Sequence, residues 1–133
     1  MNNLATRTLS AAALVAAFGA PLVLAGPASA SHGGSTAVVN SGHCSGGGVF
    51  KLKAKHDDAR IEVEYQVDTN RAGQVWHVIL KDNGKIIYAG RPRTVAPSGS
   101  FTVHRLTANR VGRDSITAWA ALGSRRCGGH VTL

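Results

Sequence analysis

Residues 60–67 read Arg-Ile-Glu-Val-Glu-Tyr-Gln-Val, in which polar and apolar side chains alternate. A period of two is typical of a β-strand with one buried and one solvent-facing side. Residues 50–55, Phe-Lys-Leu-Lys-Ala-Lys, alternate in the same way, and the intervening residues 56–59 favour a turn. The two runs therefore predict an antiparallel hairpin with its apolar side chains on one face.

A turn centred on Asp57 and Asp58 sets the expected register of this hairpin. It brings lysines opposite glutamates on the polar face, which stabilises an antiparallel pair. A slip of one residue would move the lysines to the apolar side, so the assignment of faces is strongly specified. The expected pairs are Ala54–Ile61, Leu52–Val63, Phe50–Tyr65, Lys53–Glu62 and Lys51–Glu64.

Similar alternating runs continue along the rest of the chain. Asn-Gly at residues 83–84 is typical of a type I′ hairpin turn, and it predicts Trp76 on the inner face and Ile79 opposite Tyr88 on the outer face. About seven short strands in roughly 100 residues predict an all-β fold, a two-sheet antiparallel sandwich of immunoglobulin-like or fibronectin-type-III-like build. A small barrel of about five or six strands is the alternative.

Residues 1–30 have the features of a signal peptide. Arg7 precedes an apolar stretch over residues 9–24, and residues 28–30, Ala-Ser-Ala, offer a small-x-small cleavage site. Cleavage there would leave a secreted, extracellular protein without a membrane span. An uncleaved form tethered to the membrane is the alternative.

The mature chain is expected to be one domain with one disulfide. Residues 31–48 read as a flexible Gly/Ser-rich arm, with a possible short edge strand at 36–39, and residues 49–133 as a single β-sandwich domain. In an exported protein, Cys44 and Cys127 are most simply a disulfide, which would contribute about 4 kcal/mol by closing a loop of roughly 80 residues. A zinc or redox pair is disfavoured because no CxxC spacing occurs.

Fifteen basic and seven acidic residues give a net charge of +8, or +7 without Arg7. Such charge favours encounters with anionic polymers such as wall teichoic acids, acidic glycans or nucleic acid, and it also keeps a secreted protein in solution. The absence of interleaved aromatic residues disfavours nucleic acid. The arginines that cluster toward predicted loops and strand ends are Arg91, Arg93, Arg105, Arg110, Arg113, Arg125 and Arg126.

The outer side of the Asn-Gly hairpin is the other candidate surface. An aromatic side chain at an outward strand position can stack on a sugar ring or contact a partner, whereas cross-strand packing is the simpler interpretation. His77 and Ile86 are expected beside it. The candidate binding residues are Arg91, Arg93, Tyr88, Ile79 and Trp119.

Six histidines raise the question of metal or acid–base chemistry. They are scattered without the spacing of a metal motif, so we predict no resident metal and no cofactor. His43 and His130 would flank the disulfide and could bind a metal weakly, and His32 near the mature amino terminus could chelate copper(II). His77 or His104 could act as a base in a ribonuclease-like hydrolase, but no catalytic partner is indicated.

Several segments resemble small exported actinobacterial proteins that are usually catalogued without a function. The segments are Cys-Ser-Gly at 44–46, Phe-Lys-Leu-Lys-Ala-Lys at 50–55, Arg-Ile-Glu-Val-Glu at 60–64, Trp-His-Val-Ile-Leu-Lys-Asp-Asn-Gly at 76–84 and Pro-Ser-Gly-Ser-Phe at 97–101. The resemblance implies a secreted β-sandwich with one disulfide and carries no catalytic or binding residue. We therefore expect a secreted, non-enzymatic module that binds an anionic polymer or a protein at the cell envelope. A small secreted hydrolase, or a protease inhibitor acting through the loop at residues 91–97, is the alternative.

Overall fold

The computed structural model describes residues 35–133, and all regular secondary structure in this range is β-strand. The predicted signal peptide, residues 1–30, lies outside the described residues. Within residues 35–133, no helix has the length and apolar character needed to cross a membrane. The described part of the chain is thus an all-β unit.

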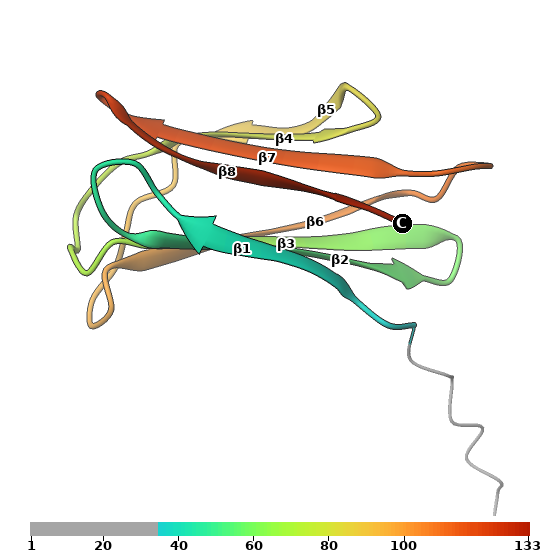
Figure 1. The fold of residues 1–133 in the computed structure, drawn as a ribbon, viewed down its shortest axis with the longest axis horizontal. Helices are drawn as coiled ribbons and strands as arrows, with labels where there is room; N and C mark the ends of the chain where they lie inside the picture. The colour runs from blue at the N-terminus through green and yellow to red at the C-terminus, as the bar shows by residue number, and fades with distance from the viewer. Residues whose placement is uncertain (1–34) are drawn as a thin grey trace, which may run out of the picture. The chain divides into compact units, whose positions relative to one another are not determined.

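Eight strands form two antiparallel sheets that pack face to face (Figure 1). The first sheet has the order β1-β2-β3-β6, and the second has the order β5-β4-β7-β8. Two separate four-stranded sheets confirm the predicted sandwich and exclude the barrel. The strands are β1 (Val38–His43), β2 (Val49–Asp57), β3 (Arg60–Asp68), β4 (His77–Asp82), β5 (Lys85–Gly90), β6 (Ser100–Ala108), β7 (Ser115–Leu122) and β8 (Arg125–Thr132).

The strand beyond the expected seven is β1, which lies within the predicted flexible arm, residues 31–48. It pairs with β2 along its whole length and is longer than the edge strand suggested at residues 36–39. The glycines that follow it form a tight connection to β2, with positive φ angles from Gly46 to Gly48. A Cβ at Gly48 would come 2.7 Å from the carbonyl oxygen of Asp68. These glycines therefore serve a turn that other residues would strain.

The β2–β3 hairpin has the predicted faces but not the predicted register. Its turn consists only of Asp58 and Ala59, and Asp58 has a φ of 54°. Leu52 consequently lies opposite Tyr65 instead of Val63, and every other partner is shifted by the same two residues. An even shift keeps each side chain on its own face, so alternation alone cannot distinguish the two registers.

The charge pairs across this hairpin are corrected accordingly. Lys53 lies 3.7 Å from Glu64, and Lys55 lies 2.9 Å from Glu62. The predicted pairs of Lys53 with Glu62 and of Lys51 with Glu64 are wrong. Opposite charges still meet across the ladder, because the polar side of β2 carries lysines and the polar side of β3 carries glutamates.

The inward side chains of both sheets form a continuous hydrophobic core. Tyr65 lies within it, with ring centroids 6.5 Å from Phe50 and 6.4 Å from Phe101, and its hydroxyl donates a hydrogen bond of 3.2 Å to the carbonyl oxygen of Cys127 in the other sheet. Each large apolar side chain buried in this way contributes about 1.5–3 kcal/mol. The further large, fully buried members of the core are Leu52, Ile61, Val63, Val67, Trp76, Val78, Leu80 and Ile116.

The predicted disulfide between Cys44 and Cys127 is present and buried. Cys44 follows β1 and Cys127 lies in β8, and these are the edge strands of the two sheets. Next to the disulfide, the backbone N–H of Ser45 donates a 2.8 Å hydrogen bond to the carbonyl oxygen of Arg126. The disulfide therefore joins the two sheets along one side of the sandwich.

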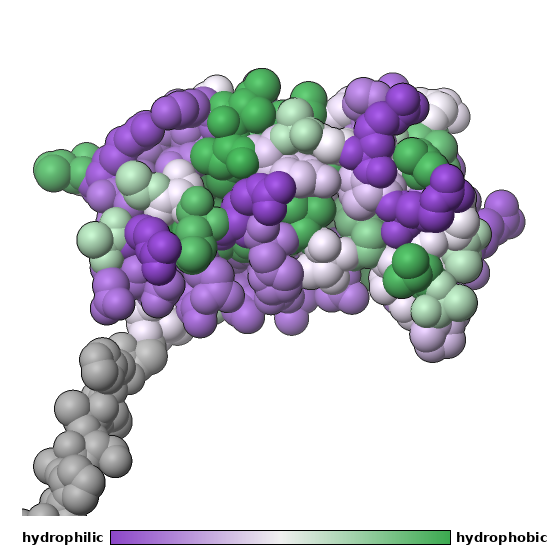
Figure 2. Space-filling view, turned by 180° about the vertical axis from the view of Figure 1, so that it is seen from behind, coloured by the Kyte–Doolittle hydropathy of each residue, from purple (hydrophilic) through white to green (hydrophobic). Residues whose placement is uncertain are grey.

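The opposite side of the sandwich is formed by the edge strands β5 and β6. Its apolar residues appear as separate islands among hydrophilic ones (Figure 2). Ile86 and Leu106 are the large apolar side chains exposed on these two strands. The guanidinium of Arg105 lies 4.5 Å from the centre of the Tyr88 ring and covers it. Single exposed apolar residues of this kind are ordinary on a protein surface.

Candidate functional site

The outward side chains of the second sheet form rows across its strands, because paired residues of neighbouring strands lie side by side on one face. Ile79 of β4 pairs directly with Trp119 of β7, which pairs with Gly128 of β8. Ile79 and Trp119 therefore lie together on the outer face, and the indole is 40% exposed. This middle row is apolar, and Trp119 is its only aromatic member.

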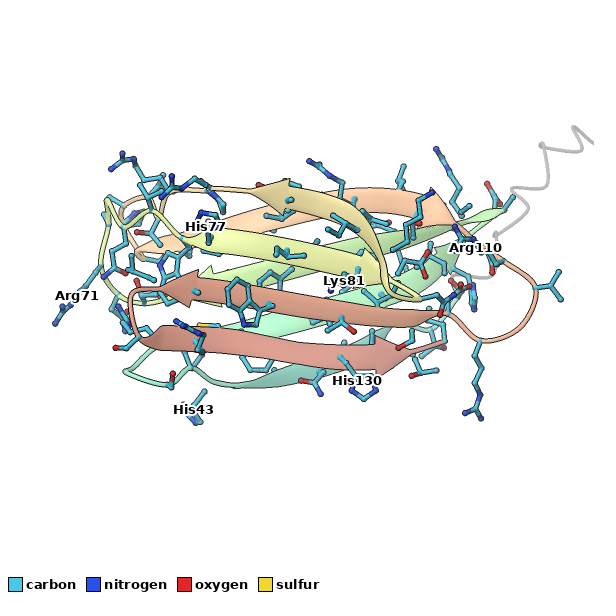
Figure 3. All side chains as sticks on the ribbon, turned by 90° about the horizontal axis from the view of Figure 1, so that it is seen from above. His43, Arg71, His77, Lys81, Arg110 and His130 are labelled. Carbon is cyan, nitrogen blue, oxygen red and sulfur yellow. A yellow bond between two sulfur atoms is a disulfide. The ribbon has the colours of Figure 1, made fainter. Side chains whose placement is uncertain are left out.

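Polar and basic side chains flank the middle row on both sides. Figure 3 shows His77 and Lys81 on β4 and His130 on β8, with β7 between them. We use the name Trp119 face for the outer side of β4, β7 and β8. The first flanking row is His77, Ala121 and Arg126, and the second is Lys81, Thr117 and His130.

Of the two arginines predicted to bind, one extends the Trp119 face and the other holds a loop. The β4–β5 register continues to the bridge between Val75 and Arg93, which places Arg91 opposite His77. Arg91 thus continues the first flanking row. Arg93 instead donates a 2.9 Å hydrogen bond from Nη1 to the carbonyl oxygen of Gly73.

Tyr88 does not belong to the Trp119 face, and the prediction that it lies opposite Ile79 on the outer side is wrong. The register shifts between Leu80 and Lys81, so that Leu80 pairs with Tyr88 whereas Lys81 pairs with Ile86. A β-bulge of this kind turns the following side chains to the other face. Tyr88 consequently packs against the core.

The fold separates the other arginines of the predicted basic cluster. The guanidinium of Arg125 lies 5.1 Å from the centre of the Trp76 ring, and its Nη2 donates a 2.6 Å hydrogen bond to the carbonyl oxygen of Gly47. Arg125 therefore ties two loops together. Arg110 lies at the other end of the sandwich (Figure 3), and Arg113 belongs to the same connection between β6 and β7.

Acidic side chains are missing from the Trp119 face as the structure describes it. Five of the seven acidic residues belong to β2, β3 and the turn between them, and the other two are buried. Lys53 and Lys55 of the first sheet are thus matched by glutamates, whereas the basic groups around Trp119 have no acidic neighbour on their face. The acidic residues are Asp57, Asp58, Glu62, Glu64, Asp68, Asp82 and Asp114.

Two open hollows border Trp119. Their volumes, about 340 and 500 Å³, fall within the range of small-ligand sites. A Cβ at Gly128 would come 2.6 Å from the carbonyl oxygen of Ala118, so glycine is required there and the space beside the indole stays open. The smaller hollow is lined by Ile79, Lys81, Thr117 and Trp119, and the larger by Thr117, Trp119, Arg126, Gly128, His130 and His43 among others.

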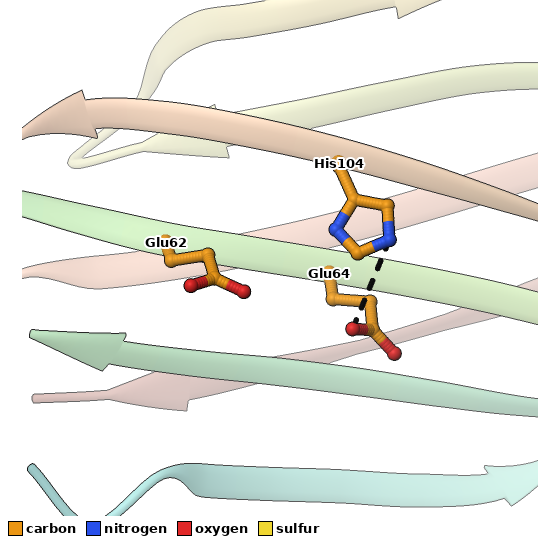
Figure 4. Close-up of side chains that lie close together, drawn as sticks. All are labelled: Glu62, Glu64 and His104. Atoms are coloured by element: carbon orange, nitrogen blue, oxygen red, sulfur yellow. Dashed lines mark ion pairs between the residues drawn. The ribbon is translucent and has the colours of Figure 1, made fainter. Parts of the chain in front are cut away.

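The first sheet carries a different group of side chains on its outer face (Figure 4). Ligand atoms of Glu62, Glu64 and His104 lie within 4.8 Å of one another, and Nε2 of His104 is 3.8 Å from a carboxylate oxygen of Glu64. Two carboxylates and an imidazole are donors that zinc can accept. Sequence reasoning missed this group because His104 reaches Glu64 only through the pairing of β3 with β6.

Lysines already occupy both carboxylates of this group. The Lys55 ammonium donates a hydrogen bond that lowers the pKa of Glu62, and Glu62 in turn raises the pKa of Lys55. Glu64 has a second partner in Lys53. A metal ion would have to displace both ammonium groups, so we interpret the cluster as an exposed ion-pair network.

The histidines considered for chemistry are not brought together. His77 lies on the outer face of the second sheet and His104 on that of the first, so the two candidate bases cannot act on one substrate group. His43 and His130 both line the larger hollow but occupy separate positions along that side of the sandwich (Figure 3). His32 lies outside the described residues.

No protein-family model matches this chain, and neither a curated protein nor a solved structure is found to be similar to it. The functional argument therefore rests on the geometry and chemistry of its own residues. The Trp119 face is the surface where an exposed aromatic side chain, basic groups and hollows coincide.

Proposed function

We propose that the protein is a secreted, non-enzymatic β-sandwich module that binds an anionic polymer at the cell envelope through its Trp119 face. The observation that carries this proposal is the one-sided charge of the second sheet. Lys81, Arg91 and Arg126 lie on or beside this face, and all acidic residues lie elsewhere. Uncompensated positive charge attracts anionic chains and concentrates them at the surface.

The disulfide supports the proposed location. Disulfides form and persist in oxidising compartments, and the bond between Cys44 and Cys127 accounts for both cysteines of the chain. Secretion after cleavage of residues 1–30 would place the chain in such a compartment.

An immunoglobulin-like or fibronectin-type-III-like build belongs to the same proposal. It is supported by the path of the chain, which passes from one sheet to the other between β3 and β4, between β5 and β6, and between β6 and β7. These crossings bring β4, β7 and β8 together in one sheet, although β4 is distant from the other two in sequence. The binding face of the proposal exists only with that strand order.

A charge exchange on the surface tests the proposal. The variant Lys81→Ser/Arg91→Ser removes two positive charges from the Trp119 face. The matched control Arg110→Ser/Arg113→Ser removes two positive charges from the connection between β6 and β7. Fluorescence anisotropy would follow the binding of labelled poly(glycerol phosphate) to the mature protein at low and at physiological salt. We expect weaker binding and a shallower salt dependence for the first variant only, because the screened attraction is local.

The opposite result has a plain physical meaning. If both variants lose affinity to the same extent, binding follows net charge alone and the Trp119 face has no special role. If salt has no effect on the unmodified protein, the electrostatic account of binding fails altogether.

A further inference from the structure

We propose that the anionic polymer is a glycan, and that one of its sugar rings stacks on Trp119 while its acidic groups contact the flanking basic residues. This inference rests on the proposed function and specifies the ligand class of the same face. It follows from the order of the rows, which places an apolar strip between two polar ones. A polymer of charge alone would gain nothing from that strip.

Trp119 offers a flat aromatic surface in the middle of the sheet. The apolar C–H face of a pyranose can pack on an indole, whereas a phosphate or carboxylate cannot. The guanidinium of Arg126 lies over the indole ring, 5.6 Å from its centre, and its Nη1 donates hydrogen bonds to the carbonyl oxygens of Gly123 and Arg125. A sugar ring that stacks on this face of the indole displaces the guanidinium, which can then pair with an acidic substituent of the sugar. The arrangement matches a sugar ring that carries an acidic substituent.

The hollows on either side of the indole provide hydrogen-bonding groups for sugar hydroxyls. Lys81 and Thr117 line the smaller hollow, and Thr117 with His130 lines the larger one. Ammonium, hydroxyl and imidazole groups can all donate hydrogen bonds. Because Gly128 leaves the β8 side open, neighbouring sugar units can extend across β7 toward the sheet edge.

Other occupants fit this face less well. A second copy of the chain would present the same basic groups, and like charges would repel. A protein partner usually covers roughly 800 Å² per side around several buried anchors. The large apolar residues here are Ile79, Trp119 and, next to Lys81 on the edge strand β5, Ile86. Single-stranded nucleic acid requires successive aromatic platforms, and Trp119 is the one aromatic residue on this described face.

Three probes separate stacking from charge. Oligogalacturonate has rings and carboxylates, cello-oligosaccharides have rings only, and polyphosphate has charge only. The two tryptophans differ, since Trp76 is fully buried and Trp119 is 40% exposed. Fluorescence changes on binding should therefore come from Trp119, and calorimetry would measure the affinities of variants that lack it.

We expect Trp119→Ala to weaken oligogalacturonate binding about tenfold, the size of one good aromatic contact, and to leave polyphosphate binding within about twofold. Trp119→Phe, which keeps a ring, should recover part of the affinity. Leu106→Ala, at an exposed apolar residue of the other sheet, is the matched control and should change neither. Lys81→Ser/Arg91→Ser should weaken both anionic probes.

The outcomes distinguish the two proposals. Equal losses of polyphosphate and oligogalacturonate binding in Trp119→Ala, or no loss of either, would overturn the stacking proposal. In that case, sensitivity of both probes to Lys81→Ser/Arg91→Ser would still uphold an anionic-polymer module. If neither anionic probe binds the unmodified protein, the proposed function fails together with this inference.

Discussion

Removal of the disulfide should cost a large part of the stability of this domain. Cys44 and Cys127 are 83 residues apart in sequence, and their bond restricts the unfolded chain. For a loop of this length, the chain-entropy relation gives a loss of about 4.5 kcal/mol. A domain of roughly 100 residues has a total unfolding free energy of about 5–15 kcal/mol. The double variant Cys44→Ala/Cys127→Ala is therefore expected to be marginally folded.

Equilibrium unfolding in urea measures this loss directly. We expect the free energy of unfolding of the double variant to fall by about 4–5 kcal/mol and its Tm to fall by about 20–35 °C. The m-value should rise, because an unfolded chain without the cross-link exposes more surface. The reduced wild-type protein should match the double variant, and a reductant should leave the double variant unchanged.

A loss below about 1 kcal/mol would refute this reasoning. It would mean that the hydrogen bond between Ser45 and Arg126 and the packing of β8 against β1 and β2 already hold this side of the sandwich together. An unchanged m-value together with a large loss would instead place the effect in the folded state.

Two further predictions concern polar contacts of the first sheet. Tyr65→Phe removes the inter-sheet hydrogen bond to Cys127 but keeps the aromatic packing, so chemical denaturation should show a loss of about 1 kcal/mol in the free energy of unfolding. Tyr88→Phe is the control. An equal loss in that variant would contradict a stabilising role of the hydrogen bond from Tyr65. Glu62 has a pKa below its ordinary value of 4.5 because of the hydrogen bond from Lys55, so its contribution is complete above pH 4.5 and disappears as the pH falls through the lowered value. Denaturation midpoints of Glu62→Gln should therefore depend less on pH in the acid range than those of the wild type, and identical pH profiles would exclude this linkage.

The predicted faces were largely correct because they depend on local alternation. Phe101 and Val103 are buried as predicted, and Thr102 and His104, which alternate with them, are exposed. The same holds for Trp119, which stands at an outward position between the buried Ala118 and Ala120 and was recognised as a candidate binding residue without knowledge of its neighbours.

Most of the errors concern strand partners, and one concerns a face. The β2–β3 register shifted by two residues, an even number that alternation cannot detect. Tyr88 changed faces because of a bulge, which inserts one residue without any signal in the pattern of polar and apolar side chains. The glycines before β2 were interpreted as a linker because their positive φ angles become necessary only in the folded turn.

Local alternation and composition were thus sufficient to predict an all-β chain with a disulfide, an excess of positive charge and an outward tryptophan. Each of these features depends on side chains a few residues apart or on simple counts of residues. The surroundings of that tryptophan required the folded chain. Ile79 flanks Trp119 from β4, which is distant in sequence, and Gly128 flanks it from β8, which follows after a turn. Five of the seven acidic residues collect on the other sheet, and the remaining two are buried. Neighbours across strands are chosen by how two sheets bury their apolar sides against each other, which is a property of the whole core and not of any one segment.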